Sequence, residues 1–259
     1  MKISEALDLH KGDTVTAVGG GGKTTIIIKL AEELAGVGYK VAITTTVKMY
    51  LPESLMVVLS GEETDLKVAV ESQLGLFNCV VVGGEVNKEG KLTALTENEL
   101  AQIRSITKLD YLLIEGDGSK GKPFKAPRCH EPVVPEFSTL VLVVIGAECI
   151  DQPLSEKYFH ALEQIKLLTG LDMGEVVTER TILRIMLHSL GYKKNVPDSA
   201  RWTVFINKVE NQKDLNKSFS LAAKLEAQGV NNVIIGAAGK KPPKIYYTSS
   251  KRVLDKCLE

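Results

Sequence analysis

The sequence lacks the features of a membrane-spanning or exported protein. No apolar run approaches the roughly 20 residues that a membrane helix needs. The first residues show no basic region followed by an apolar stretch, so we expect no signal peptide. The cysteines form no Cys-x-x-Cys pair, and they are Cys79, Cys129, Cys149 and Cys257. Free thiols and a reduced, cytoplasmic location are the expectation.

An excess of charge of either sign is also missing. Lys and Arg total 32, and Asp and Glu total 32, so the formal net charge is zero. Nucleic-acid-binding proteins usually carry a basic patch, and those that bind single strands add aromatic side chains to it. We therefore expect no nucleic-acid partner and, because no apolar run or basic excess is present, no membrane partner.

Short apolar segments alternate with segments of helical periodicity. The expected strands are 15–18, 41–45, 56–59, 80–82, 111–115, 140–145, 203–206, 233–235 and 245–247. The expected helices are 24–37, 64–75, 97–107, 156–169, 178–190 and 215–228. This alternation predicts an α/β fold of three αβα layers around a mainly parallel sheet, with a helical insert.

The order of these segments suggests three parts. We expect a core over 1–146, a mostly helical insert or lobe over 147–198, and a return to the core sheet over 199–259. The alternative is that the middle part belongs to the helical layer of one domain.

Residues 17–25 read A-V-G-G-G-G-K-T-T between an expected strand and an expected helix. Glycines let the backbone turn tightly and aim N–H groups at a phosphate, and the following helix N-terminus favours an anion. In such a P-loop, Lys23 would reach the β- and γ-phosphates and the Thr24 hydroxyl would bind Mg²⁺. The expected nucleotide-binding residues here are Gly19, Gly20, Gly21, Gly22, Lys23, Thr24 and Thr25.

Glu115 ends the apolar strand 111–115 and Asp117 lies two residues on, at the place where a P-loop enzyme holds Mg²⁺ and orients the attacking water. We expect Asp117 to serve the metal and Glu115 to position water, although the two roles could be exchanged. With Lys23 these acids are the candidate catalytic residues. After strand 41–45, the hydroxyl of Thr46 or Thr45 could complete the Mg²⁺ shell.

The strand 203–206 is followed by Asn207-Lys208-Val209-Glu210. This resembles the Asn-Lys-x-Asp motif with which GTPases bind guanine. We therefore place Asn207, Lys208 and Glu210 near the base. Glu is one methylene longer than Asp, so ATP and GTP both remain open.

A basic loop follows the acids. It carries four cations within residues 120–128, which argues for an anionic second substrate, the alternative being a solvated charged loop. The candidate residues for this anion site are Lys48, Lys120, Lys122, Lys125, Arg128 and His130. The adjacency of Cys129, His130 and Glu131 is poor spacing for zinc. We expect His10, His160 and His188 to be structural or surface residues.

Taken together, these motifs resemble the YqeC family of accessory proteins for selenium-dependent molybdenum hydroxylases. The similar stretches are the P-loop, T-T-T-V-K-M-Y-L-P, L-I-E-G-D-G-S-K-G-K-P-F-K-A-P, H-E-P-V-V-P and I-N-K-V-E. The family usually shows Glu-Ala-Asp-Gly where this chain has Gly116 between the two acids. The resemblance implies a P-loop NTPase that helps to mature the polyanionic molybdenum cofactor, with a selenium-dependent hydroxylase as a partner.

The sequence thus predicts Mg²⁺-dependent binding and hydrolysis of ATP or GTP, coupled to handling of the molybdenum cofactor. One alternative is a small-molecule kinase whose acceptor lies in residues 116–131. A second alternative is a nucleotide-gated switch that docks onto a partner with little turnover.

Overall fold

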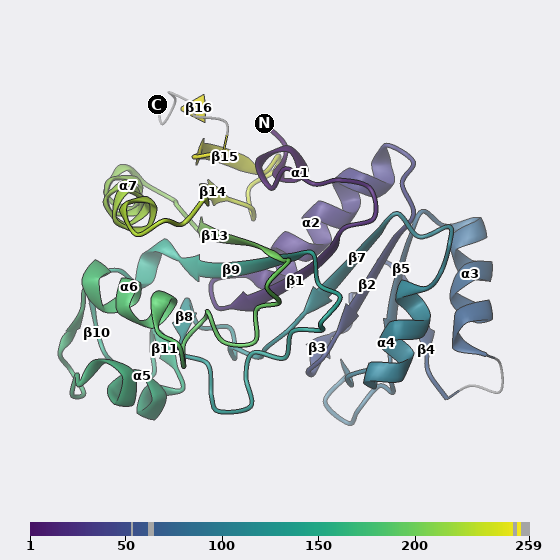
Figure 1. Ribbon diagram of the computed structural model, residues 1–259, viewed down its shortest axis with the longest axis horizontal. Helices are drawn as coiled ribbons and strands as arrows, with labels where there is room; N and C mark the ends of the chain where they lie inside the picture. The colour runs from purple at the N-terminus through teal and green to yellow at the C-terminus, as the bar shows by residue number, and fades with distance from the viewer. Residues whose placement is uncertain (53, 62–64, 251–252, 255–259) are drawn as a thin grey trace.

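A ten-stranded sheet forms the centre of the computed structural model, which describes residues 1–52, 54–61 and 65–250, and the backbone alone of 253–254 (Figure 1). The strand order is β16-β15-β14-β13-β9-β1-β7-β2-β5-β4. The strands are β1 (Thr14–Gly19), β2 (Val41–Thr45), β4 (Met56–Leu59), β5 (Cys79–Gly83), β7 (Tyr111–Glu115), β9 (Leu140–Gly146), β13 (Arg201–Asn207), β14 (Asn232–Ala237), β15 (Lys244–Thr248) and β16 (Val253–Leu254).

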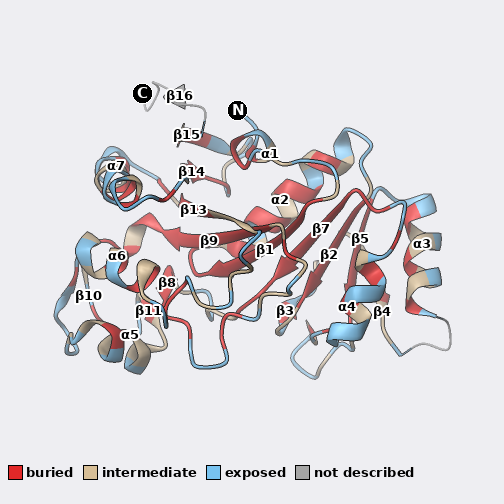
Figure 2. Ribbon diagram, viewed as in Figure 1, coloured by how far each residue is buried: buried red, intermediate tan, exposed pale blue. Residues whose placement is uncertain are grey.

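The sheet is parallel from β4 to β14, and β15 and β16 add antiparallel pairs at one edge. This confirms the predicted α/β fold with a mainly parallel sheet. Parallel strands covered on both faces are expected to be apolar throughout, and every residue of β9 is buried (Figure 2).

Helices cover both faces of the sheet. They are α1 (Ile3–Ala6), α2 (Lys23–Gly36), α3 (Leu66–Leu76), α4 (Glu97–Arg104), α5 (Leu162–Thr169), α6 (Glu179–Leu187) and α7 (Gln212–Ala227). Successive side chains of a strand point to opposite faces. In β9, Leu142 and Val144 join the core beneath α1 and α2, whereas Val143 and Ile145 join the core beneath α6 and α7. The α3 and α4 helices cover β2, β5 and β7 with a third cluster.

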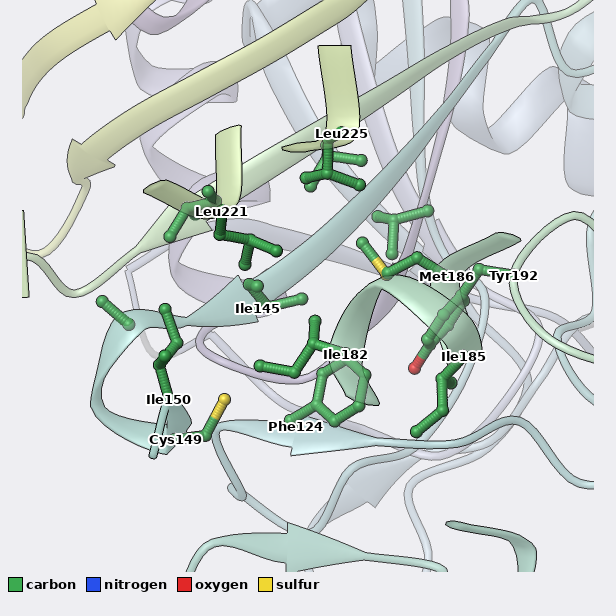
Figure 3. Packing of buried hydrophobic residues seen from close by; sticks show 14 of the residues in the cluster. Phe124, Ile145, Cys149, Ile150, Ile182, Ile185, Met186, Tyr192, Leu221 and Leu225 are labelled. Carbon is green, nitrogen blue, oxygen red and sulfur yellow. The ribbon is translucent and has the colours of Figure 1, made fainter. Parts of the chain in front are cut away.

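The segment 147–198 packs onto the sheet through a shared core. It contains the short elements η1 (Ala147–Cys149), β10 (Gln152–Pro153), β11 (Phe159–His160) and β12 (Val176–Val177), besides α5 and α6. Figure 3 shows Ile182 and Ile185 of α6 packed near Phe124 and Ile145, with Tyr192 beside them. The boundaries at 146 and 198 stay a prediction.

Several element boundaries differ from those expected. Residues 156–161 are not helical, because β11 pairs in parallel with β8 (Phe124–Lys125), and α5 begins only at Leu162. Ala161, with φ of 58°, turns the chain between the two. The α6 helix ends at Leu187 instead of 190.

Some features lie outside the sequence predictions or outside the described residues. The sequence predicts neither the α1 helix nor the hairpin of β3 (Met49–Tyr50) with β6 (Lys91–Leu92). The expected helix start at Thr64 and the cysteine Cys257 lie outside the described residues. Of the described cysteines, Cys129 is exposed and the other two are buried, all as free thiols.

The topology brings the predicted motifs to one edge. The carboxyl ends of neighbouring parallel strands meet there, and ligands of open α/β sheets bind outside those ends. The loop after β1 lies between the ends of β9 and β7, with β13 and β2 one strand further out. No helix in the described part of the chain has the length and apolar character that a membrane crossing needs.

Candidate functional site

The P-loop connects β1 to the start of α2 through glycines at positions that leave no room for a side chain or require a positive φ. Gly21 has φ of 69°, and a Cβ there would lie 2.2 Å from the Gly146 nitrogen at the end of β9. Gly22 is the N-cap of α2, with φ of 105°. In the described part of the chain, the N–H groups of Lys23, Thr24 and Thr25 have no hydrogen-bond acceptor. These first-turn donors are the groups that bind phosphate at a helix N-terminus.

The Lys23 ammonium is buried among acceptors. It donates to the Gly19 carbonyl at 2.6 Å and lies 3.1 Å from Asp117 Oδ1 and 4.0 Å from Glu115 Oε1. A buried charge needs such partners, because an unpaired one would cost several kcal/mol. The structure therefore brings the three predicted catalytic residues together around one ammonium group.

Asp117 is enclosed completely. Both carboxylate oxygens accept the Gly19 N–H, at 2.9 and 3.0 Å, and Oδ2 lies 3.4 Å from the Lys125 ammonium. The side chain has no exposed area. Asp117 thus fastens the first glycine of the P-loop, and its oxygens are occupied by protein donors.

Glu115 lies on the open side of Lys23. Its Oε2 accepts the Thr24 hydroxyl at 2.7 Å, and both residues line the cleft. Burial raises the pKa of Glu115, and the Lys23 charge opposes part of that rise. A hydroxyl beside a carboxylate offers the hard oxygen ligands that Mg²⁺ prefers, so this pair fits the metal better than the enclosed Asp117 does.

The threonines after β2 are engaged with the backbone. The Thr45 hydroxyl donates to the carbonyls of Val47 and Glu115, and the Thr46 hydroxyl donates to the Val133 carbonyl at 3.2 Å. The residues of this stretch that line the cleft are Val47, Lys48, Met49 and Tyr50. The role of Thr46 at a metal stays a prediction, and these contacts give it no support.

The three predicted base-site residues of the Asn-Lys-x-Glu stretch make different contacts. The Asn207 amide donates to the Gly21 carbonyl at 2.8 Å and its oxygen accepts the Ala238 N–H at 2.9 Å, so it ties the P-loop to the end of β14. Lys208 lines the cleft and pairs with Glu148 at 2.7 Å. Glu210 is largely exposed and lies 4.0 Å from Lys240.

The cations of the basic loop also differ in their surroundings. Lys125 is fully buried, with its ammonium 2.7 Å from Glu131 and 2.8 Å from the Gly118 carbonyl. Its charge is therefore balanced inside the protein. Lys120 and Arg128 line the cleft, and so does Lys48 from the segment that follows β2.

The remaining two predicted anion-site residues lie outside this cleft lining. Lys122 lines an adjoining cavity of about 660 Å³. His130 stands beside the exposed thiol of Cys129, with 3.8 Å between Nδ1 and Sγ.

The P-loop and the basic loop touch directly. The Gly21 N–H donates to the Lys122 carbonyl at 2.9 Å. A Cβ on Gly20 would come within 2.6 Å of the same carbonyl and 2.7 Å of the Pro123 carbonyl. A shift in one loop must therefore move the other.

Sequence reasoning missed several residues around the cleft, and His160 is the first of them. His160 lines the rim shared by the 940 Å³ cleft and the adjoining cavity, and it accepts a hydrogen bond from Arg128 at 3.3 Å. Burial and then the charges of Arg128, Lys125 and Lys120 lower its pKa to about 4, so it is neutral at pH 7. The β8–β11 pairing places His160 opposite Lys125 in register, and no sequence signal marks that pairing.

Glu148 is the second missed residue, and a signal for it existed. It lies two residues after the end of the apolar strand β9, which is next to β1 in the sheet, just as Asp117 lies two residues after the end of β7. It pairs with Lys208, and its other oxygen is buried without a partner in the described residues.

Comparison with known proteins agrees with this geometry. The sequence model of a family described as "YqeC protein" matches residues 15–163, more than half of the chain. A protein of Escherichia coli (strain K12) named "Uncharacterized protein YqeC" is 29% identical over 228 residues, which are 88% of each chain. The "ATP-dependent dethiobiotin synthetase BioD" of Aquifex aeolicus (strain VF5) is 29% identical over 184 residues, covering 67% of this chain and 82% of that protein.

Proposed function

The chain belongs to the YqeC family, and from this premise we propose that it binds ATP with Mg²⁺ at the P-loop and hydrolyses it. The observation that carries the proposal is the start of α2. Free N–H groups, the Lys23 ammonium and the Thr24 hydroxyl converge there on one cleft. This is the donor set that a triphosphate needs, because its negative charge must be met by fixed donors.

We infer that the two acids have roles other than those that the sequence favours. Thr24 and Glu115 would hold Mg²⁺, directly or through water, while Asp117 keeps Gly19 and Lys23 in place. Mg²⁺ when bound would neutralise charge on the β- and γ-phosphate oxygens. Lys23 would share its protons between the acids and the γ-phosphate, and the loop amides would stabilise charge that develops during transfer.

ATP is preferred over GTP for two reasons. The Aquifex relative is ATP-dependent by name. In addition, the Asn207 amide donates to the Gly21 carbonyl of the P-loop and its oxygen accepts the Ala238 N–H, and the largely exposed Glu210 pairs with Lys240. A guanine-reading acid would instead have to face the base.

We further propose that the second ligand is anionic, and that from the family resemblance it is the molybdenum cofactor of a selenium-dependent hydroxylase. Lys48, Lys120 and Arg128 line the cleft beyond the P-loop and fit a phosphate or pyrophosphate group. Lys125 drops out of this set because its charge is already balanced by Glu131 and Asp117.

A small-molecule kinase is the second candidate, favoured by the same cations. They extend the phosphate-binding cleft toward a place where an acceptor could take the γ-phosphate instead of water. Transfer of labelled γ-phosphate to an added anionic acceptor would favour the kinase, and release of free phosphate would favour the hydrolase.

The test is phosphate release from ATP with Mg²⁺ by the full chain. Lys23→Ala should lower turnover by about a hundredfold to a thousandfold, the typical loss for one donor to transition-state charge. Lys29→Ala is the matched control, because Lys29 lies on the same helix and only pairs with Glu32 at 2.6 Å. Equal turnover of wild type and Lys23→Ala would contradict the proposal.

A further inference from the structure

The cleft extends past the P-loop to the hairpin of β3 and β6. Tyr50, on that hairpin, lines the cleft with 68% of its surface exposed. The Lys91 ammonium lies 4.8 Å from the centre of the Tyr50 ring, and Glu89 holds Lys91 at 2.9 Å. A cation over an aromatic face attracts it electrostatically, so this contact positions the ring. With 68% of its surface exposed, Tyr50 remains accessible to a ligand.

Two further ammonium groups belong to the lining of this cleft. Lys48 precedes Tyr50 by two residues and Lys120 comes from the basic loop, and both line the cleft. Among the described residues neither side chain has a hydrogen bond or an ion pair, whereas Lys23 and Lys125 are fully engaged. Free ammonium groups in a cleft are suited to an anion.

The hairpin lies on the flank of the P-loop opposite the predicted base site. Asn207 ends β13, which is the second strand from β1 on one side. Tyr50 follows β2, which is the second strand from β1 on the other side. A nucleotide with its phosphates on the P-loop and its base toward β13 therefore leaves the Tyr50 end of the cleft open.

We propose that this end of the cleft binds a planar heteroaromatic ligand that carries a phosphate or similar anionic group. Its ring stacks on Tyr50, and its anion is held by Lys48 and Lys120. The ligand binds together with the nucleotide and not in its place. This inference rests on the proposed function, since it specifies the second ligand of the same cleft.

The test uses 4-methylumbelliferyl phosphate, a planar ring with a phosphate, in calorimetric titrations of the full chain. The protein is first saturated with Mg²⁺ and adenylyl imidodiphosphate, an ATP analogue that is not hydrolysed. The expected result is one-to-one binding in this state, with much weaker binding of 4-methylumbelliferone, which lacks the phosphate, and of glycerol 2-phosphate, which lacks the ring.

Three substitutions separate the two contacts. Tyr50→Ala should weaken binding on the order of tenfold, because stacking on an aromatic side chain is lost, and Tyr50→Phe should restore it. Lys48→Gln should remove most of the preference for the phosphate ester over the phenol. Phe77→Ala is the control, because Phe77 is an exposed aromatic residue at the end of α3, away from the cleft lining.

Three outcomes would overturn the inference: no binding of the phosphate ester, binding that Tyr50→Ala leaves unchanged, or displacement of the probe by the ATP analogue. The titration of the analogue itself tests the proposed function separately. Binding of the analogue without the probe refutes only the ring site, and binding of the probe without the analogue refutes only the nucleotide site.

Discussion

Glu115 is a buried carboxylate whose proposed role at the metal would come at the expense of stability. Burial raises its pKa above the ordinary value of 4.5. In the unfolded chain the same carboxyl ionises at about pH 4.3, so between that pH and its raised native pKa the folded state retains a proton that the unfolded state releases. The folded protein therefore loses stability as the pH rises through this window.

Glu115→Gln should stabilise the nucleotide-free protein at neutral pH, with a gain that disappears below about pH 4, where the wild-type carboxyl is protonated in both states. Denaturant unfolding of both proteins at about pH 4 and about pH 7.5 measures this difference. The same substitution should lower ATP turnover by about a hundredfold or more, since an acid at the metal is lost. A gain independent of pH would show that Glu115 is not held at a raised pKa.

At this scale the sequence predicts residue types better than their partners. The pattern at the end of strand 111–115 identifies both acids, and the structure places both within 4.0 Å of Lys23. It leaves their roles open, because the Gly19 N–H that occupies Asp117 comes from 98 residues away in the chain. Lys125 is also indistinguishable from the surface cations in the sequence, because its partner Glu131 gives no signal of burial.

At the scale of elements, the contact between the P-loop and the basic loop is the feature with most consequence. The loops meet where Gly21 donates to the Lys122 carbonyl, and Gly20 leaves no room for a side chain. We therefore expect a ligand on the basic loop to alter nucleotide binding through this contact.

Gly20→Ala should push residues 122–123 away from the P-loop, since its Cβ would meet two carbonyl oxygens at under 3.0 Å. We expect a loss of stability of about 1–3 kcal/mol, as for other overpacked sites, together with weaker ATP binding. Gly118→Ala is the matched control, because a methyl group added there would have no atom within 4 Å and its φ is not positive. Denaturant unfolding and calorimetric titration with ATP measure both effects. Equal stability and equal ATP affinity of the two variants would contradict the proposed contact between the loops.

Elements with strong periodicity or continuous apolar character are predictable from the sequence, and short ones are not. The observed bounds of the strand and helix that flank the P-loop, Thr14–Gly19 and Lys23–Gly36, differ from the expected ones by one residue at each end. The two-residue strands β8 and β11 escape prediction, because Phe124 and Phe159 pair across a long stretch of intervening chain and carry no local pattern. That pairing is also what brings His160 to the cleft.

At the scale of the whole molecule, the segment 147–198 and the central sheet share one apolar core. Ile182 and Ile185 of α6 share one apolar cluster with Ile145 of β9 and Leu221 of α7. Composition and periodicity predict a mostly helical segment, whereas its α-helices span only Leu162–Thr169 and Glu179–Leu187. Composition and periodicity do not reveal the shared core, because which faces of α6 and α7 meet depends on contacts distant in the sequence.

The central proposal for the whole molecule is that a triphosphate binds between the start of α2 and the two acids. The most direct test is the thermal unfolding of the full chain with and without Mg²⁺ and ATP, for wild type, Lys23→Ala, Thr24→Ala and the control Lys29→Ala. Thr24→Ala leaves the buried ion pairs of Lys23 intact, so it remains informative if Lys23→Ala is poorly folded.

ATP with Mg²⁺ at about 100 times its Kd should stabilise wild type and Lys29→Ala by about 2.7 kcal/mol. For a chain of this length that is a rise in Tm of roughly 5–10 °C. Lys23→Ala should show no rise at the same concentration, and Thr24→Ala should lose the part that depends on Mg²⁺. An unchanged Tm for wild type, or an equal rise in all four proteins, would contradict the existence of a triphosphate site at this loop.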